Sequence, residues 1–290
     1  MKGYKGFNPG LVCKDKQYLE NTVFEEPEAK ICEKGMHFCE NPFDVLDYYD
    51  LVRSDGRFND FAEVEALDET KTDDAKKFCT KKLKIGAKLS FAGFVKACVD
   101  FVLEKTIREM PDANVGSGDY AQIGNSGYSA QIGSSGDYAQ IGNSGYSAQI
   151  GSSGYSAQIG SSGDYAQIGS SGDYAKIGSS GDSAKIGSSG GYAQIGSSGY
   201  SAKIGSSGDY AKIGCTGSES VICCAGHGSV VKAPAGCWIT LAEWKYDDEK
   251  DRGVPVCVKT EYVDGERIKA DTPYTLTNGE FVEVATDGEF

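Results

Sequence analysis

Few side chains of this 290-residue chain have the type and spacing that catalysis requires. His37 is the first candidate, because an imidazole exchanges its proton near pH 7 and can serve as a general acid or base. Its neighbours Met36 and Phe38 are equally typical of a hydrogen-bonded structural histidine. No serine has a histidine and an acid at a spacing that would nominate a nucleophilic triad. The residue types alone therefore define no catalytic residue.

Metal binding is the second chemistry to weigh. Cys223, Cys224, His227 and Cys237 carry the ligand types of a closed zinc site. Adjacent cysteines are awkward ligands for one tetrahedral ion, and a buried free cysteine is a common small core residue, so both interpretations stay open. The ten cysteines include no CxxC pair, and we expect reduced thiols. Apart from this open case we expect no metal and no cofactor, since the Gly-Ser-Ser-Gly turns do not match a phosphate-binding loop.

Charge and hydropathy limit the partners. The chain has 42 acidic and 29 basic residues and a formal net charge of -13. Clustered Lys and Arg are needed to bind phosphates, so we expect neither direct nucleic-acid binding nor a basic membrane anchor. The N-terminal residues lead into no apolar run typical of a signal peptide, and no 18-residue apolar segment follows. We therefore expect a cytoplasmic protein without a membrane span.

The middle of the chain is an internal repeat. From Gly118 it reads Gly-Asp-Tyr-Ala-Gln-Ile-Gly-Asn-Ser, then Gly-Tyr-Ser-Ala-Gln-Ile-Gly-Ser-Ser, and this nine-residue phrase occurs eleven times without insertion. Alanine recurs every nine residues from Ala121 to Ala211, and isoleucine from Ile123 to Ile213. A disordered Gly/Ser linker would not hold an isoleucine in such register, so the repeat predicts folded structure.

Each phrase divides into a strand and a turn. Ala and Ile stand two residues apart, on one face of an extended segment, while Tyr and Gln or Lys point the other way. Gly-Ser-Ser-Gly supplies turn residues. One phrase cannot bury its isoleucine alone, so successive phrases must stack. The sequence thus predicts a mainly β protein, whose parallel β-solenoid has about 18 residues, two phrases, per coil.

The repeat resembles known two-sided β-rolls, from which we take an architecture and no activity. Phrases such as Gly199-Tyr200-Ser201 lack the aspartate of the calcium-binding rolls, so we expect no calcium. The variable pair alternates Asp-Tyr and Tyr-Ser in the first four phrases, which predicts two inequivalent faces per coil. One face should carry a tyrosine stack with a gap at Ser156. The expected partner-binding residues are Tyr120, Tyr138, Tyr174, Tyr192, Tyr210, Asp119, Asp137 and Asp173.

The flanks predict two further domains that cap the solenoid, whose open strand edges would otherwise aggregate. Residues 1–112 should form an α+β domain, with strands at Gly3–Phe7 and Phe61–Leu67 and a helix at Ser90–Ile107. The solenoid should occupy 113–232. Residues 233–290 should form a β-rich cap, with hairpin signals at Asp264-Gly265 and Asn278-Gly279 and a core that contains Trp238 and Trp244.

The two ends carry a family resemblance. Met1-Lys2-Gly3-Tyr4-Lys5-Gly6-Phe7, Cys32 to Pro42 and the phrase Val263-Asp264-Gly265-Glu266-Arg267-Ile268-Lys269 resemble an uncharacterised family of phage and gut-bacterial prophage proteins. In that family similar ends flank Gly/Ser-rich repeats of varying number. The resemblance implies a phage context and no particular chemistry.

The order of elements in the first domain also resembles ADP-ribosyltransferase folds, through Tyr4-Lys5-Gly6, Gly35-Met36-His37-Phe38 and the strand at Phe61–Leu67. The resemblance implies an early Arg or His that binds the dinucleotide and a late catalytic Glu. The sequence departs from it, with Lys5 at the early position and no late Glu in a matching context. If such an enzyme were present, Lys5 and His37 would be the residues to test.

These observations favour a non-enzymatic phage or prophage accessory protein whose rigid solenoid binds a protein. The expected partner is a host or phage protein, with a host defence or nucleic-acid enzyme as the candidate target for inhibition. A homo-oligomer is compatible with the same surface. Two alternatives stay open: an ADP-ribosyltransferase-like enzyme with a solenoid spacer, and a structural component of the virion or its assembly.

Overall fold

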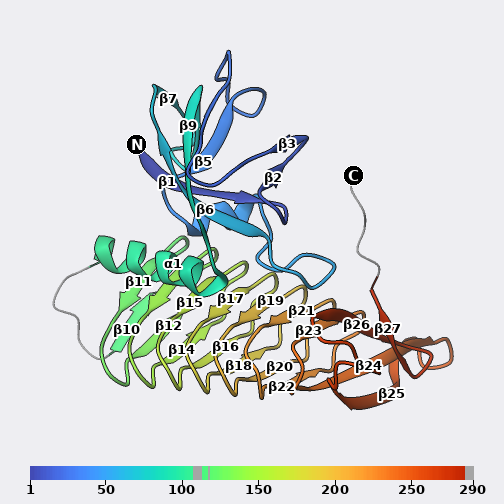
Figure 1. Cartoon of the computed structure of the whole chain (residues 1–290). Helices are drawn as coiled ribbons and strands as arrows, with labels where there is room; N and C mark the ends of the chain where they lie inside the picture. The colour runs from blue at the N-terminus through green and yellow to red at the C-terminus, as the bar shows by residue number, and fades with distance from the viewer. Residues whose placement is uncertain (107–112, 117, 285–290) are drawn as a thin grey trace.

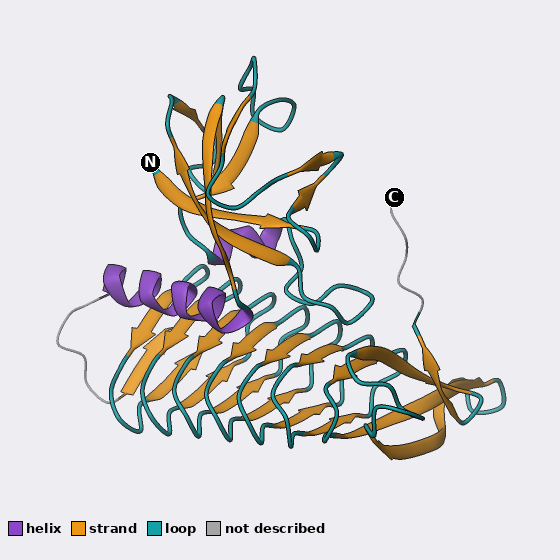
Figure 2. Cartoon of the chain, in the orientation of Figure 1, coloured by secondary structure: helices purple, strands orange, loops and turns teal. Residues whose placement is uncertain are grey.

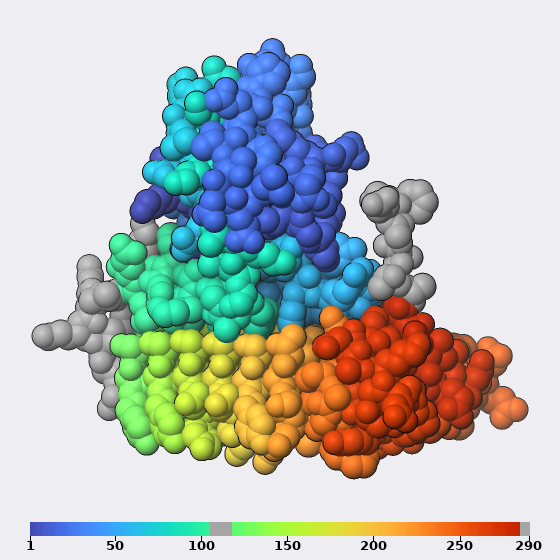
Figure 3. Space-filling model, in the orientation of Figure 1, coloured from blue at the N-terminus to red at the C-terminus, as the bar shows by residue number. Residues whose placement is uncertain are grey.

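The computed structural model describes residues 1–106, 113–116 and 118–284. A β domain at the N-terminus sits on one side of a β-solenoid, and a smaller β cap closes the C-terminal end of the solenoid (Figures 1, 2 and 3). Among the described residues, no helix has both the length and the apolar character needed to cross a membrane. The predicted boundary at residue 112 falls outside the described residues.

The N-terminal domain is built on a seven-stranded antiparallel sheet with the order β4-β9-β6-β1-β5-β8-β7. Its strands are β1 (Lys2–Phe7), β4 (Val23–Glu25), β5 (Met36–Cys39), β6 (Asp60–Ala66), β7 (Thr70–Lys71), β8 (Lys77–Thr80) and β9 (Lys82–Leu89), and β2 (Val12–Cys13) pairs with β3 (Lys16–Gln17) as a separate hairpin. The predicted strands correspond to β1 and β6, which are direct neighbours. A short 3₁₀ helix, η1 (Phe43–Asp47), follows β5 and faces the solenoid.

The solenoid consists of two parallel sheets, and its registers confirm the predicted coil of 18 residues. Ile123 pairs with Ile141 on one sheet, and Ile132 pairs with Ile150 on the other. We call the sheet under the N-terminal domain the covered sheet and the opposite one the bare sheet. The covered sheet contains β11 (Gln122–Asn125), β13 (Gln140–Asn143), β15 (Gln158–Ser161), β17 (Lys176–Ser179), β19 (Gln194–Ser197), β21 (Lys212–Cys215) and β23 (Val230–Ala233). The bare sheet contains β10 (Ala113–Gly116), β12 (Gln131–Ser134), β14 (Gln149–Ser152), β16 (Gln167–Ser170), β18 (Lys185–Ser188), β20 (Lys203–Ser206) and β22 (Val221–Cys224).

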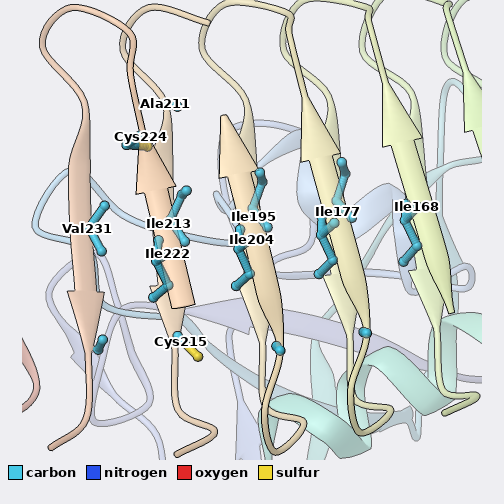
Figure 4. Packing of buried hydrophobic residues seen from close by; sticks show 14 of the residues in the cluster. Ile168, Ile177, Ile195, Ile204, Ala211, Ile213, Cys215, Ile222, Cys224 and Val231 are labelled. Carbon is cyan, nitrogen blue, oxygen red and sulfur yellow. The ribbon is translucent and has the colours of Figure 1, made fainter. Parts of the chain in front are cut away.

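Isoleucines from the two sheets meet in a thin dry core, as the sequence predicts (Figure 4). Ile141, Ile159 and Ile177 are at most 1% exposed, and the repeat alanines from Ala130 to Ala211 are completely buried. Burial of one such isoleucine side chain contributes about 1.5–3 kcal/mol, so the row is the main source of stability in this domain. The fourth residue of each strand also points inward, and at Ser161, Ser179 and Ser197 its buried hydroxyl has no hydrogen-bond partner in the described part of the chain.

The single α-helix of the described residues, α1 (Phe91–Thr106), lies on the covered sheet and runs along the solenoid axis (Figure 1). It corresponds to the helix predicted at Ser90–Ile107. The sequence predicts this helix as part of an α+β N-terminal domain. In the structure it packs chiefly on strands β11, β13 and β15, while its Phe94 also stacks on Phe61 of the β domain at 3.8 Å between ring centroids. The helix therefore joins the β domain to the solenoid.

The C-terminal cap extends both sheets. In the bare sheet β24 (Trp238–Asp247) pairs in parallel with β22, and β25 (Arg252–Tyr262) then pairs antiparallel with β24. In the covered sheet β26 (Thr272–Thr277) pairs antiparallel with β23 and with β27 (Glu280–Glu283). These strands leave no free edge of the last coil on either sheet, which supports the predicted capping role.

Two predictions for the cap need correction. Asn278 and Gly279 form the predicted hairpin turn, with φ of 51° and 74°, but Asp264 lies in a crossover between the two sheets, where its carboxylate accepts the backbone N–H of Ile268 at 3.0 Å. Trp238 is 49% exposed and is therefore not a core residue. It pairs in register with Val221 of β22, whose side chain points outward, and paired residues of parallel strands point to the same side of the sheet.

Candidate functional site

The first candidate site is an aromatic row along one edge of the solenoid. We call it the tyrosine ladder and define it as Tyr120, Tyr138, Tyr155, Tyr174, Tyr192, Tyr210 and His227. Neighbouring ring centroids are 4.9 to 5.8 Å apart, and the rings of Tyr174 and Tyr192 are parallel within 4°. The tyrosines are 40 to 58% exposed. The sequence correctly predicts that Tyr120 stacks on Tyr138, and that Tyr174, Tyr192 and Tyr210 stack in succession. It places them wrongly on a strand face, because they lie in the turns between strands. The structure adds Tyr155 and His227 to the row.

The predicted gap at Ser156 is absent because Tyr155 fills it. Its ring lies 5.8 Å from Tyr138 and 5.3 Å from Tyr174. The turn offers two adjacent positions for an outward side chain, and a ring at either position reaches the same row. A shorter row, Tyr128, Tyr146 and Tyr165, stacks in the same way on the opposite edge.

The turn geometry explains the regularity of the ladder. Tyr138 and Tyr174 have φ of 56° and 58°, in the left-handed region that side chains other than glycine rarely adopt. This conformation directs the backbone N–H along the solenoid axis, and the N–H of Tyr174 donates to the carbonyl of Gly191 in the next coil at 2.8 Å. The ladder of backbone hydrogen bonds thus continues through the turns and fixes the pitch of the rings.

The aspartates beside the ladder have a structural role that the sequence analysis missed. Asp119 accepts the backbone N–H of Asp137 at 3.1 Å, and Asp137 accepts that of Tyr155 at 2.8 Å. Asp173 accepts the N–H of Gly191 at 2.8 Å. In each case the donor lies 18 residues further along, so the carboxylate joins one coil to the next. The shared position of these aspartates, directly after the turn glycine, is the sequence signal for this role.

The second candidate site is a cavity of about 740 Å³ in the N-terminal domain. Lys5 and His37, the two residues that the enzyme alternative singles out, both line it, and the Lys5 ammonium donates to the backbone carbonyl of His37 at 2.9 Å. The Lys5 ammonium also lies 3.6 Å from the Cys13 thiol, which the Tyr49 hydroxyl contacts at 3.0 Å. These contacts bring residues from β1, β2 and β5 to one wall of the cavity.

Burial controls the ionisation of this wall. Lys5 is 5% exposed, and removal from water lowers the pKa of its ammonium. Burial also lowers the pKa of His37 to about 4, with the nearby positive charge of Lys5 adding to the effect. His37 is consequently neutral at pH 7, and its Nε2 accepts the backbone N–H of Cys32 at 3.0 Å. This bond is the structural role that the sequence analysis weighs against catalysis.

The four residues of the possible zinc site do not come together. Cys223 points outward from β22 and is exposed, while its neighbour Cys224 points into the core and is buried. His227 lies at the edge, 5.4 Å from the Tyr210 ring. Residues 1–106, 113–116 and 118–284 contain no group of three or more side chains arranged to hold a metal ion. Cys224 instead takes the inward position of Ser206, with which it pairs.

The covered sheet carries a third set of contacts that the sequence analysis did not anticipate. Asp44, Asp47 and Asp50 stand three residues apart around η1 and accept hydrogen bonds from the outward amides of the solenoid. Gln140 donates to Asp44 at 3.1 Å, Gln158 donates to Asp47 at 3.2 Å, and Gln194 donates to Asp50 at 3.0 Å. The N-terminal domain therefore docks through a row of carboxylates that matches the solenoid.

Comparison with known protein families finds a similarity over the N-terminal third of the chain. Residues 1–97 match a family described as a domain of unknown function (DUF7666). Neither the curated proteins nor the solved structures yielded a match to the chain. The match covers β1 to β9 and the start of α1, and it ends before the repeats.

Proposed function

We propose that this chain is a non-enzymatic protein-binding scaffold whose solenoid presents the tyrosine ladder to a partner. The observation that carries the proposal is the continuity of the ladder: six half-exposed tyrosines and His227 lie on one edge at a pitch of about 5 Å. Tyrosine is enriched in protein interfaces, since a rigid ring buries much area at little entropic cost. Packing in the solenoid fixes these rings in advance.

We further propose that the scaffold is a phage or prophage accessory protein that acts in the host cytoplasm and occupies a host or phage protein. Support comes from the resemblance of both chain ends to the phage family and from the net charge of -13. An acidic surface suits a partner that otherwise binds an acidic polymer, such as a defence or nucleic-acid enzyme. Because Asp119, Asp137 and Asp173 each use one oxygen to hold the next coil, the tyrosines contribute more to this binding than the aspartates.

Affinity capture from host lysate tests the proposal with a matched pair of variants. In the ladder variant, Tyr155, Tyr174 and Tyr192 become serine, the residue that already occupies turn positions such as Ser156. In the control, Tyr128, Tyr146 and Tyr165 of the opposite edge become serine. We expect one stoichiometric partner that the ladder variant loses and the control retains. Retention by both variants, with melting temperatures unchanged, would remove the ladder as the binding surface.

The cavity around Lys5 favours a second candidate function, an ADP-ribosyltransferase-like or other small-molecule site. Its volume of about 740 Å³ is in the usual range for ligand pockets, and its wall contains a buried ammonium without an ion pair among the described residues. Incubation with labelled NAD and host lysate tests this candidate. Label transfer that is lost in Lys5→Met and kept in His37→Gln would favour the enzyme, while absence of transfer leaves the scaffold as the function of the chain.

A further inference from the structure

The two sheets of the solenoid have the same outward residues and different surroundings. In each four-residue repeat strand the first residue, Gln or Lys, and the third residue, Gly, point outward. The second residue, Ile, and the fourth, Ser or Asn, point inward. On the covered sheet the outward residues are largely buried, as at Gln158 and Gly160. On the bare sheet the equivalent residues, such as Gln149 and Gly151, are exposed. The solenoid thus offers the same surface twice, and the protein itself covers only one copy.

The covered copy shows what fits this surface. The outward glycines of the covered sheet form a furrow into which α1 places one apolar side chain per strand. A Cβ atom added at Gly142 would lie 3.2 Å from Val102, and one added at Gly178 would lie 2.9 Å from Val95. At Gly196 it would lie 2.5 Å from the Phe91 ring. Only glycine leaves room for the helix here.

The match between helix and furrow follows from their repeats. Parallel strands are about 4.8 Å apart, and one helical turn rises about 5.4 Å. In a helix that runs along the solenoid axis, about one helical turn therefore lies over each strand. In α1 the side chains at these positions are Phe91, Val95, Val99 and Val102. Any amphipathic helix with apolar residues at this spacing would meet the same furrow in the same way.

The bare copy is open along five strands. Five glycines line this furrow, and no atom of the described residues lies within 4 Å of a Cβ added at any of them: Gly133, Gly151, Gly169, Gly187 and Gly205. A groove of about 780 Å³ runs over the first four of these glycines, and its lining extends from Gln131 to Lys203. Four steps of about 4.8 Å give a length of about 19 Å, which about 13 residues of helix would fill. An exposed apolar pair, Val221 and Trp238, continues the row beyond Lys203.

The charges of the outward lysines indicate what kind of helix the bare sheet would bind. On the covered sheet the Gln and Lys row meets carboxylates, and Lys212 lies 3.8 Å from Asp50. On the bare sheet Lys185 and Lys203 are adjacent in register, which places two like charges side by side. Neither has an ion pair with another described residue. A partner with carboxylates along one flank would supply the neutralisation that Asp44, Asp47 and Asp50 supply on the other sheet.

We propose that the bare sheet binds an amphipathic α-helix of a partner protein, with apolar side chains such as Val and Phe in the glycine furrow and carboxylates against Gln149, Gln167, Lys185 and Lys203. This surface is separate from the tyrosine ladder, so the proposal does not depend on the ladder. It defines the partner by chemistry: about four helical turns, one apolar residue in each, and an acidic flank.

Fluorescence anisotropy with the full-length protein tests this proposal. The probe is a lactam-stapled 16-residue peptide that keeps Phe and Val at the spacing of Phe91, Val95, Val99 and Val102 and carries Glu on one flank. The control peptide carries Lys in place of each Glu. We expect saturable binding of the acidic peptide and at least tenfold weaker binding of the basic peptide.

Three variants locate the site. Gly151→Val, Gly169→Val and Gly187→Val together should weaken binding at least tenfold without lowering the melting temperature, since each added side chain has open space. Lys185→Glu with Lys203→Glu should reverse the preference between the two peptides. Tyr174→Ser with Tyr192→Ser should leave peptide binding unchanged, which separates this site from the ladder. No saturable binding, or equal binding by the valine variant, would overturn the proposal. So would self-association of the free protein, detected by light scattering, that the valine variant loses, because a second copy would then be the occupant.

Discussion

Gln140 and Asp44 join the solenoid to the N-terminal domain through a buried hydrogen bond, in which the Gln140 amide donates to the Asp44 carboxylate at 3.1 Å. The amide oxygen of Gln140 also accepts the Asn41 side-chain N–H at 2.9 Å, so one side chain satisfies two groups of the other domain. Burial raises the pKa of Asp44 to about 6, and the hydrogen bond from Gln140 opposes this shift by stabilising the ionised carboxylate. The bond places the β domain on one sheet of the solenoid.

Replacement of Gln140 by leucine should therefore destabilise the protein, whereas the same change at Gln149 should not. Gln140→Leu leaves Asn41 and Asp44 buried without their partner, a loss of about 1–3 kcal/mol. Gln149 has the same neighbours in sequence and lies exposed on the bare sheet. Urea unfolding followed by circular dichroism measures both. Equal midpoints for the two variants would contradict the docking role of Gln140.

The outward glycines should respond to substitution in opposite ways on the two sheets. A valine at Gly178 would press its Cβ to 2.9 Å from Val95 of α1, and such overpacking costs about 1–3 kcal/mol. A valine at Gly169 meets open space and replaces a poor strand former with a good one, a gain of about 0.5–1 kcal/mol. Thermal melting of Gly178→Val and Gly169→Val should thus shift in opposite directions. A loss of similar size in both would show that the bare furrow is also packed.

The strict nine-residue spacing explains how much the sequence reveals. Because Ala and Ile never leave their register, the parallel sheets, the coil of two phrases and the dry core could all be predicted. The sequence could not show which sheet is covered, since both sheets use the same phrase. That choice depends on Asp44, Asp47 and Asp50, whose spacing of three residues becomes meaningful only beside the Gln row.

The candidate sites, too, could be predicted where they depend on the spacing of the repeat, and could not where they depend on how the chain folds. The stacking of Tyr120 on Tyr138 and of Tyr174 on Tyr192 was predictable from their 18-residue spacing, whereas Tyr155 was missed because its position in the phrase differs by one residue. The left-handed turn brings both positions to one edge, and nothing in the amino-acid types alone shows this. The contact of Lys5 with His37 joins β1 to β5 and depends on the order of strands in the sheet.

Substitution of Asp173 tests whether the aspartates stabilise the solenoid by hydrogen bonds from one coil to the next. Its carboxylate accepts the Gly191 N–H at 2.8 Å, so Asp173→Ala should lose about 0.5–2 kcal/mol, the usual cost of removing a side-chain acceptor from a backbone N–H. Asp173→Asn keeps an acceptor oxygen and should retain most of the stability. Chemical denaturation of both variants makes the comparison. If the alanine and asparagine variants lose the same amount, the negative charge matters and the hydrogen bond does not.

His37 should make the N-terminal domain sensitive to acid. Its pKa is about 4 in the folded protein and 6.5 for an ordinary histidine, so between these values the unfolded chain binds a proton that the folded protein does not. Stability therefore rises with pH over this interval: the contribution is fully present above pH 6.5 and is lost as the pH falls toward 4. His37→Gln retains an acceptor for the Cys32 N–H and does not titrate. The urea midpoint of the wild-type domain should fall more between pH 7 and pH 4.5 than that of His37→Gln, because carboxyl groups that titrate in the same interval are common to both. Parallel curves for the two proteins would mean that His37 is protonated in the folded state, and its role as a neutral acceptor would have to be abandoned.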